Sequence, residues 1–191
     1  MKFDDFILAS ASPRRKILLE KADYQFEIIV SDVDESLFST EGVTSTEHTM
    51  ELALAKAKDV AKDYPSRLVM GADTVVDFDG LIIGKPQDAA HAEEITRMLF
   101  SAPHKVITGV ALVCIDAGIE AVEAATTIVY PRTLTEEQIL DHIKNGKWQG
   151  KAGAYGIQET GDDFVDRIEG SFTNVIGLPM ELVEQMLSEI D

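Results

Sequence analysis

The chain has 191 residues, of which 45% are hydrophobic and 27% are charged, and its 34 acidic and 17 basic residues give a net charge of −17. This composition predicts one folded domain over residues 1–191 and excludes wholesale disorder. The acidic balance argues against binding to a nucleic-acid backbone or to an anionic membrane surface, because both attract basic proteins.

The first part of the chain alternates strand-like and helix-like segments. We expect strands at 6–9 and 26–30, and between them a helix at 12–21 whose Ser-Pro start suits a helix N-terminus. Residues 31–45 are polar and acidic and predict a loop. A helix is expected at 46–62, where apolar residues recur at helical spacing.

The middle of the chain reads as strands joined by tight turns. Two apolar runs, 67–72 and 74–78, predict strands on either side of Asp73, and Asp79-Gly80 predicts a hairpin turn into a strand at 81–83. A helix is expected at 89–100.

The remaining segments complete the predicted architecture. They are long strands at 106–115 and 119–130, a helix at 135–144, a glycine-rich loop at 145–156, a strand at 164–168, a loop at 170–179 and a final helix at 180–189. An antiparallel pair within an alternating chain predicts an α/β protein with a mixed sheet.

The compartment is inferred from what the sequence lacks. The start of the chain is acidic, with no signal-peptide pattern, and no apolar run approaches the length of a membrane span. The single cysteine, Cys114, lies in an apolar run, which favours a buried thiol over a nucleophile. We therefore expect a cytoplasmic protein with no membrane partner.

Several cations lie in turns that could hold an anion. Arg14 and Arg15 occupy the first turn of a predicted helix, near Ser10 and Ser12. Arginines are unfavourable at this positive end of a helix unless an anion lies nearby, so the group predicts a phosphate site. An ordinary Ser-Pro cap with two solvated arginines explains the pattern equally well.

Three lysines are harder to assign. Lys85 lies in Gly-Lys-Pro and Lys151 in Gly-Lys-Ala-Gly, and each taken singly is best explained as a surface lysine in a turn. Lys56 lies on a predicted helix that is apolar on one face. The favoured explanation is that its aliphatic side chain covers this face while its ammonium group reaches solvent.

Two carboxylates are candidates for chemistry. Asp73 lies within an apolar run, where a carboxylate needs a metal, a lysine or a catalytic role to offset its burial, although a turn aspartate is also possible. Glu35 follows other acids and fits a solvated loop as well as a site. The four histidines lack zinc-site spacing. Carboxylates with lysines and arginines favour Mg²⁺ or Mn²⁺ acting on a phosphate substrate.

Five short motifs, taken together, resemble the Maf family of nucleoside triphosphate pyrophosphatases. In chain order they are Leu-Ala-Ser-Ala-Ser-Pro-Arg-Arg at 8–15, Gly-Ala-Asp-Thr at 71–74, Gly-Lys-Pro at 84–86, Lys-Ala-Gly-Ala-Tyr-Gly-Ile-Gln at 151–158 and Gly-Ser-Phe-Thr-Asn-Val-Ile-Gly-Leu-Pro at 170–179. They span nearly the whole chain. One departure is Trp-Gln-Gly at 148–150, where many members carry Glu-Pro.

The resemblance implies a Maf/Ham1-like α/β fold, with an elongated mixed sheet, flanking helices and a cleft between two lobes. It also implies hydrolysis of a nucleoside triphosphate to the monophosphate and diphosphate with a divalent cation, Mg²⁺ or Mn²⁺. The family is associated with nucleotide-pool cleaning and cell-division arrest, and its members usually form homodimers.

The resemblance also assigns roles to individual residues. Asp73 would accept a proton, and Glu35 with Asp73 would hold the metal. Ser10, Arg14, Arg15, Lys56 and Lys85 would contact phosphates, with the two lysines part of the catalytic set.

Substrate choice is assigned to three positions, Arg14, Thr74 and Gln158. Their combination resembles the branch that acts on dTTP and UTP. Two alternatives stay open, a Ham1-like ITP or XTP pyrophosphatase and a nucleotide-binding division regulator with little turnover.

Overall fold

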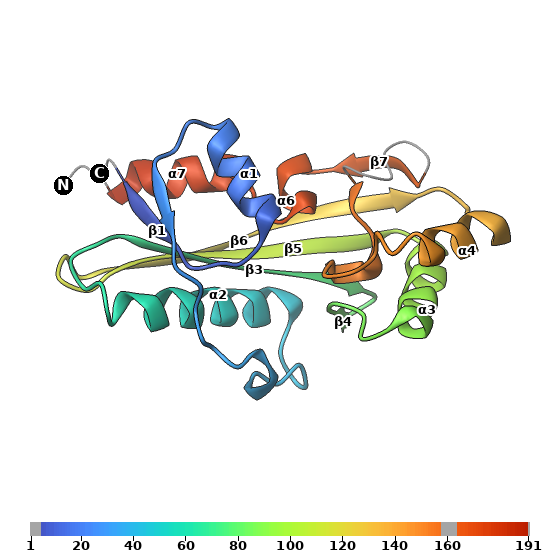
Figure 1. The fold of residues 1–191 in the computed structure, drawn as a ribbon, viewed down its shortest axis with the longest axis horizontal. Helices are drawn as coiled ribbons and strands as arrows, with labels where there is room; N and C mark the ends of the chain where they lie inside the picture. The colour runs from blue at the N-terminus through green and yellow to red at the C-terminus, as the bar shows by residue number, and fades with distance from the viewer. Residues whose placement is uncertain (1–4, 158–163, 191) are drawn as a thin grey trace.

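The computed structural model describes residues 5–157 and 164–190, which form a mixed sheet covered by helices (Figure 1). The strands are β1 (Phe6–Leu8), β2 (Phe26–Ile28), β3 (Val69–Phe78), β4 (Leu81–Ile83), β5 (His104–Cys114), β6 (Ile119–Pro131) and β7 (Val165–Glu169). Their order is β2-β1-β3-β5-β6-β7, with β4 beside β3. β1 is parallel to β2 and β3, and the other pairs are antiparallel, so the predicted mixed sheet is confirmed.

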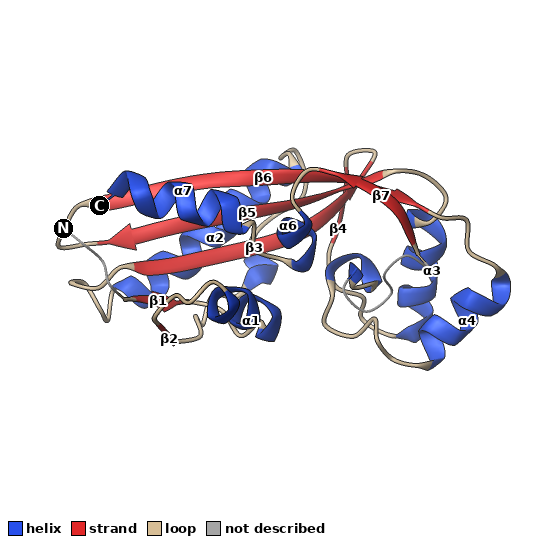
Figure 2. Cartoon of the chain, turned by 90° about the horizontal axis from the view of Figure 1, so that it is seen from above, coloured by secondary structure: helices blue, strands red, loops and turns tan. Residues whose placement is uncertain are grey.

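Helices cover both faces of this sheet. They are α1 (Pro13–Lys21), α2 (Ser45–Ala61), α3 (Ala89–Leu99), α4 (Glu136–Lys144), α6 (Phe172–Ile176) and α7 (Met180–Ile190), with short 3-10 turns η1 (Glu35–Leu37) and η2 (Ala152–Ala154). In Figure 1, α2 lies on one face and α1, α6 and α7 lie on the other. Figure 2 shows α3 and α4 gathered at the far end of the long strands.

Helix α2 begins at a capping box and packs unusually close to the sheet. The Thr44 side chain accepts from the backbone N–H of Glu47, whose side chain accepts from the backbone N–H of Thr44. A Cβ atom at Gly71 of β3 would lie 2.1 Å from the Ala53 carbonyl oxygen, and one at Gly109 of β5 would lie 2.4 Å from that of Thr49. Only glycine permits this approach, which brings α2 side chains to the sheet.

Three apolar clusters divide the molecule into two lobes. In the first lobe, α1 and α7 cover one face of the sheet around Leu19, Leu112 and Met186, and α2 covers the other around Ala57 and Val69. The second lobe holds α3, α4, η2 and β4, packed around a cluster that includes Leu99, Phe100, Tyr155 and Phe164. Strands β3 and β5 contribute to clusters of both lobes, so the lobes share one sheet.

Most predicted elements are confirmed, and four predictions are wrong. The runs 67–72 and 74–78 form one strand, β3, with Asp73 inside it. The predicted loops at 31–45 and 145–156 contain the turns η1 and η2, and the predicted loop at 170–179 contains α6. Ser171 caps α6 by accepting from the N–H of Asn174, a local signal too short to show helical periodicity.

Two expectations that concern apolar segments can be compared with the structure. Cys114 is 1% exposed at the end of β5, so its prediction as a buried thiol is confirmed. Within residues 5–157 and 164–190, no helix is both long enough and apolar enough to cross a membrane.

Candidate active site

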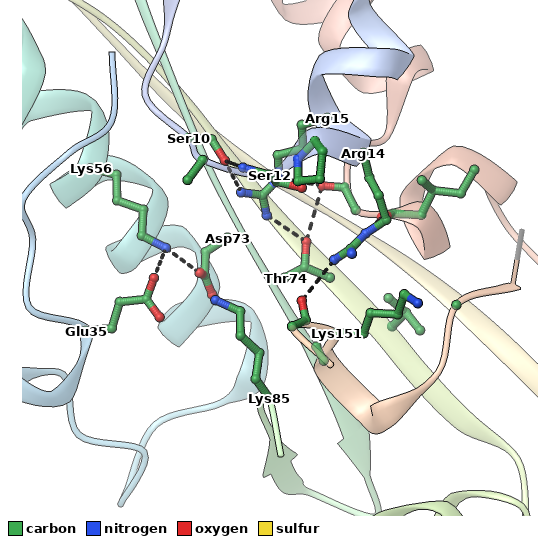
Figure 3. A pocket seen from close by; sticks show the side chains of 18 of the residues that line it. Ser10, Ser12, Arg14, Arg15, Glu35, Lys56, Asp73, Thr74, Lys85 and Lys151 are labelled. Carbon is green, nitrogen blue, oxygen red and sulfur yellow. Dashed lines mark hydrogen bonds and ion pairs between the residues drawn. The ribbon is translucent and has the colours of Figure 1, made fainter. Parts of the chain in front are cut away.

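A cavity of about 320 Å³ lies between the two lobes. The first lobe contributes the segment from Ala9 to Arg15, with Glu35 and Lys56, and the second lobe contributes Lys85 and residues from 150 to 156. Asp73 and Thr74 of β3 lie between these two sets (Figure 3). The volume falls within the range of small-molecule sites, and its position confirms the predicted cleft.

Lys56 and Asp73 form a buried ion pair at the base of the cavity. Helix α2 carries Lys56 to the sheet, where its Nζ atom lies 2.7 Å from Asp73 Oδ1 and 2.7 Å from Glu35 Oε1 (Figure 3). The Lys56 and Asp73 residues are each 8% exposed. This pairing explains how an aspartate is accommodated within a central strand.

Glu35 completes the pair from a more open position. Its side chain is 48% exposed and comes from η1, which the Asp34 side chain caps by accepting from the N–H of Ser36. Partial burial disfavours the charged carboxylate, but the hydrogen bond and charge of Lys56, with the charges of Lys85 and Arg15, hold the pKa of Glu35 below its usual value. Glu35 is therefore ionised at neutral pH.

Arg15 is a buried connector between three segments of the chain. Its guanidinium donates to the Gly177 carbonyl at 2.8 Å, to Ser10 Oγ and the Ala72 carbonyl at 2.9 Å each, and to Thr74 Oγ1 at 3.1 Å. Burial lowers the pKa of Arg15, and the charge of Asp73 opposes that shift. These bonds use most of its donors, so Arg15 mainly fixes the positions of Ser10 and Thr74.

Arg14 joins the two sides of the cavity. Its Nε donates to the carbonyl of Ile176, at the end of α6, and its Nη2 donates to the carbonyl of Gly150 in the second lobe, both at 3.3 Å. Thr74 Oγ1 lies nearby, 3.0 Å from Thr108 Oγ1. Arg14 and Thr74 therefore both line the cavity.

The N-terminus of α1 borders the same cavity. Ser12 occupies the N-cap position but its side chain makes no capping hydrogen bond, and the first turn holds no acidic residue. Its backbone N–H donates instead to Ser10 Oγ at 3.2 Å. The interpretation of Ser12 as an ordinary side-chain cap is therefore wrong, and the positive end of the helix faces a cavity suited to an anion.

The cavity is positive although the whole chain is strongly acidic. Among the described residues, its lining has five cations, Arg14, Arg15, Lys56, Lys85 and Lys151, against the two carboxylates Glu35 and Asp73. Low-dielectric walls around charges of one sign concentrate the electrostatic field. The site is therefore built to attract a polyanion.

The donor set fits a hard cation that is shared with a phosphate substrate. Glu35 and Asp73 each accept from the same Lys56 ammonium, so their carboxylates lie within reach of one ion. Among residues 5–157 and 164–190, no group of three His, Cys, Asp or Glu side chains could enclose a metal by itself. Mg²⁺ commonly takes one or two carboxylates and completes its shell with phosphate oxygens and water.

The structure brings the described candidate residues together at this cavity. Those lining it are Ser10, Arg14, Arg15, Glu35, Lys56, Asp73, Thr74 and Lys85. Gln158 lies outside the described residues. The interpretation of Lys56 as a solvent-seeking helix lysine is wrong, because it is buried against Asp73.

Sequence reasoning missed several residues of the second lobe. Lys151, interpreted singly as a surface lysine, is 7% exposed and lines the cavity, so that interpretation is wrong. Tyr155 also lines it, as do the apolar side chains of Val76 and Val106. Two signals pointed to this wall, the five glycines at and near 145–156, which indicated close backbone approach, and the motif at 151–158, which contains both Lys151 and Tyr155.

The chain matches a family model described as Maf-like protein over residues 5–190. It is 43% identical to a dTTP/UTP pyrophosphatase of Citrifermentans bemidjiense over 187 residues, covering 97% of this chain and 96% of that protein. It is 47% identical to a dTTP/UTP pyrophosphatase of a Geobacillus species over 175 residues, covering 91% of each.

The fold is also similar to that of a solved structure. A HAM1 protein from Coxiella burnetii superposes with a TM-score of 0.51 at 14% sequence identity, covering 100% of this chain and 98% of the other. At this identity the likeness concerns the fold alone, and it agrees with the Ham1-like architecture expected from the motifs.

Proposed function

The chain belongs to the Maf family, and from this premise we propose that it hydrolyses dTTP and UTP to the nucleoside monophosphate and diphosphate. One observation supports this reaction most directly. The carboxylates of Asp73 and Glu35 meet Lys56 inside a cavity whose other charged side chains, among residues 5–157 and 164–190, are all cationic. A nucleoside triphosphate supplies the polyanion that such a cavity attracts.

Binding of the triphosphate relies on groups from three sides of the cavity. Lys85 and Lys151 approach from the second lobe, and the N-terminus of α1 approaches from the first. Lysine supplies compact charge to phosphate oxygens, and a helix N-terminus supplies backbone donors. Lys56 and Arg15 retain few donors for a phosphate, so their main contribution is to hold Asp73, Glu35, Ser10 and Thr74 in place.

Asp73 is the proton acceptor in this proposal. Lys56 occupies its Oδ1 atom, and Oδ2 makes no hydrogen bond to another residue of the described parts. A water held at Oδ2 attacks the α-phosphorus, forming a new P–O bond while the bond from that phosphorus to the bridging oxygen of the diphosphate breaks. The water proton passes to Asp73, and the electron pair of the broken bond leaves with the diphosphate.

Glu35 and Asp73 would hold Mg²⁺ or Mn²⁺ when the substrate is bound. Such an ion neutralises charge that builds up on the phosphate oxygens. Glu35 suits this role because it is ionised and half-exposed beside the cavity. Lys56 keeps both carboxylates oriented toward the same region.

Base selection is proposed for Arg14 and Thr74, together with Gln158 by resemblance. Both residues line the cavity together with the apolar Val76 and Val106, whose side chains suit the faces of a base. An amide such as that of Gln158 offers a donor and an acceptor, as the edge of uracil or thymine requires.

A panel assay of diphosphate release tests the proposal. We expect dTTP and UTP to be hydrolysed with Mg²⁺ far faster than dATP, GTP, ITP or XTP, each giving one monophosphate per diphosphate. Preference for ITP or XTP would replace the proposal with the Ham1-like activity. Tight binding of dTTP without diphosphate release would replace it with a nucleotide-binding regulator.

Two further expectations come from the resemblance. We propose that the chain forms a homodimer and acts in the cytoplasm, where it would clear unwanted pyrimidine nucleotides. Light scattering with size-exclusion chromatography checks the dimer, and fractionation of the source cells checks the location.

A further inference from the structure

Tyr155 is anchored beneath the second-lobe wall of the cavity by a buried histidine. Its hydroxyl lies 2.8 Å from Nε2 of His104, the first residue of β5. His104 Nδ1 lies 3.1 Å from the carbonyl oxygen of Leu99, the last residue of α3. Tyr155 is 5% exposed and His104 is 2% exposed.

The direction of these hydrogen bonds follows from the chemistry of the partners. A carbonyl only accepts, so His104 Nδ1 carries the proton that it donates to Leu99. Burial lowers the pKa of His104 to about 4, so the ring is neutral at pH 7 and its Nε2 has a lone pair. Tyr155 therefore donates to His104, and Phe100 packs edge-on against both rings.

This anchor holds the segment from Gly150 to Tyr155, which carries several contacts of the cavity. Its Gly150 carbonyl accepts from Arg14, and its Lys151 lines the cavity. The backbone N–H of Gly153 donates to the carbonyl of Gly84 at 3.1 Å. Gly84 immediately precedes Lys85, so the position of that lysine depends on the same segment.

We propose that His104 is a positioning residue for the reaction, which fixes Tyr155 and, through the Gly153–Gly84 hydrogen bond, places Lys85 against the triphosphate. This inference rests on the proposed pyrophosphatase function. It goes beyond that function because His104 lies outside the cavity lining and touches no substrate.

The first test removes a single oxygen from the anchor. Tyr155→Phe keeps the ring and its packing, and we expect kcat/KM for dTTP and UTP to fall about tenfold, because small displacements of binding groups have large kinetic effects. Tyr130→Phe is the matched control, since the Tyr130 hydroxyl bonds Glu169 at the exposed side of β6 and β7. An equal loss in the control variant would overturn the proposal.

A double-mutant cycle tests the connection to Lys85. In a Lys85→Ala background, Tyr155→Phe should reduce kcat/KM by less than about threefold, because the side chain that the anchor places is already gone. A second tenfold loss in that background would show that the two effects are independent, and the proposal would fail.

Replacement of the acceptor gives an independent reading. His104→Gln can still accept at the place of Nε2 and should retain most activity, whereas His104→Leu should match Tyr155→Phe. If His104→Leu does not fold, the kinetics of His104→Gln and Tyr155→Phe still test whether activity depends on this hydrogen bond. Equal kinetics of the folded Gln and Leu variants would contradict the role of the acceptor.

Hydrogen exchange separates this inference from the proposed function. In Tyr155→Phe, the amide of Gly153, which donates to the Gly84 carbonyl, should exchange faster, while the amides of α2 stay unchanged. Unchanged exchange at the Gly153 amide would overturn the anchor. A wild-type chain that releases no diphosphate would instead refute the proposed function, and the exchange result would still report on the anchor.

Discussion

The Nζ atom of Lys56 lies 2.7 Å from Oδ1 of Asp73, and this contact joins helix α2 to the middle of strand β3. Neither charge would be stable alone at this depth, since an unpaired buried charge is costly. The pair also fixes one carboxylate oxygen of Asp73 and leaves the other toward the cavity. Structure and chemistry therefore depend on the same contact.

Asp73→Asn should lower kcat for dTTP and UTP by about 10²–10⁴, because an amide cannot accept the proton of the attacking water. The protein should stay folded, since Lys56 keeps Glu35 as a partner. Diphosphate release and thermal unfolding, measured on the same samples, check both statements. Turnover close to that of the wild type would remove Asp73 from the chemistry.

Lys56→Met should reduce the free energy of unfolding by about 3 kcal/mol, because it leaves the Asp73 carboxylate buried without its partner. Lys58→Met is the control on the same helix. Its ion pair with Glu120 is half-exposed, so its loss should cost less than about 1 kcal/mol. Urea unfolding at pH 7 compares the two variants, and equal losses would contradict the importance of the buried pair.

The double variant Arg14→Trp/Thr74→Gln should shift substrate preference away from pyrimidine triphosphates. Arg14 and Thr74 both line the cavity, and larger side chains at these positions would change the shape of the proposed base site. We expect the ratio of kcat/KM for dTTP to that for GTP to fall about tenfold or more. The nucleotide panel measures it, and an unchanged profile would refute their role.

Chelation by EDTA should stop hydrolysis, and added Mg²⁺ or Mn²⁺ should restore it. The physical reason is that two carboxylates and a triphosphate together form the donor set of a hard cation. Glu35→Gln should raise the Mg²⁺ concentration needed for half-maximal activity by about tenfold. Full activity after exhaustive chelation would contradict the metal requirement.

Acid should destabilise the protein through His104. Its pKa is lowered from 6.5 to about 4 by burial, so the unfolded chain binds more protons than the folded one between these values. Stability from this residue is present above pH 6.5 and is lost as the pH falls through this window. The loss between pH 7 and pH 5 should be about 2 kcal/mol.

Urea unfolding of the wild type and His104→Gln at the two pH values measures this difference. The difference in free energy of unfolding between the wild type and His104→Gln should be about 2 kcal/mol smaller at pH 5 than at pH 7. Parallel curves for the two proteins would contradict the assignment, since every other titrating group is shared.

Local patterns predicted most of the fold because the helices have clear caps and periodic apolar faces. Helix α1 was expected at 12–21 and forms at Pro13–Lys21. The sequence predicts two strands in place of β3, because an aspartate is unfavourable inside a strand. Asp73 is stabilised there by Lys56, which lies on helix α2, so the sequence around Asp73 gives no sign of this partner. Helix α6 is only five residues long and is held by Ser171 and by Asn174, whose side chain donates to the carbonyl of Val106.

The residues of the candidate site were predicted mainly from short motifs. The roles of individual lysines and arginines could not be predicted in this way, because they depend on tertiary contacts. Lys85 and Lys151 each look like a turn lysine until the two lobes are placed together around the cavity. The hydrogen bonds of Arg15 could not be predicted from local sequence either, because they join Ser10, Thr74 and Gly177, which are far apart in the chain.

The continuous strands β3 and β5 restrict how this enzyme can admit its substrate. They run without interruption from one lobe into the other and pair with each other from Val69–Val113 to Asp77–Lys105. A hinge of the kind found between domains on a linker would break this ladder, so wide opening is disfavoured. Entry and release must instead depend on bending of the sheet and on movement of more exposed segments that border the cavity, such as the stretch around Glu35.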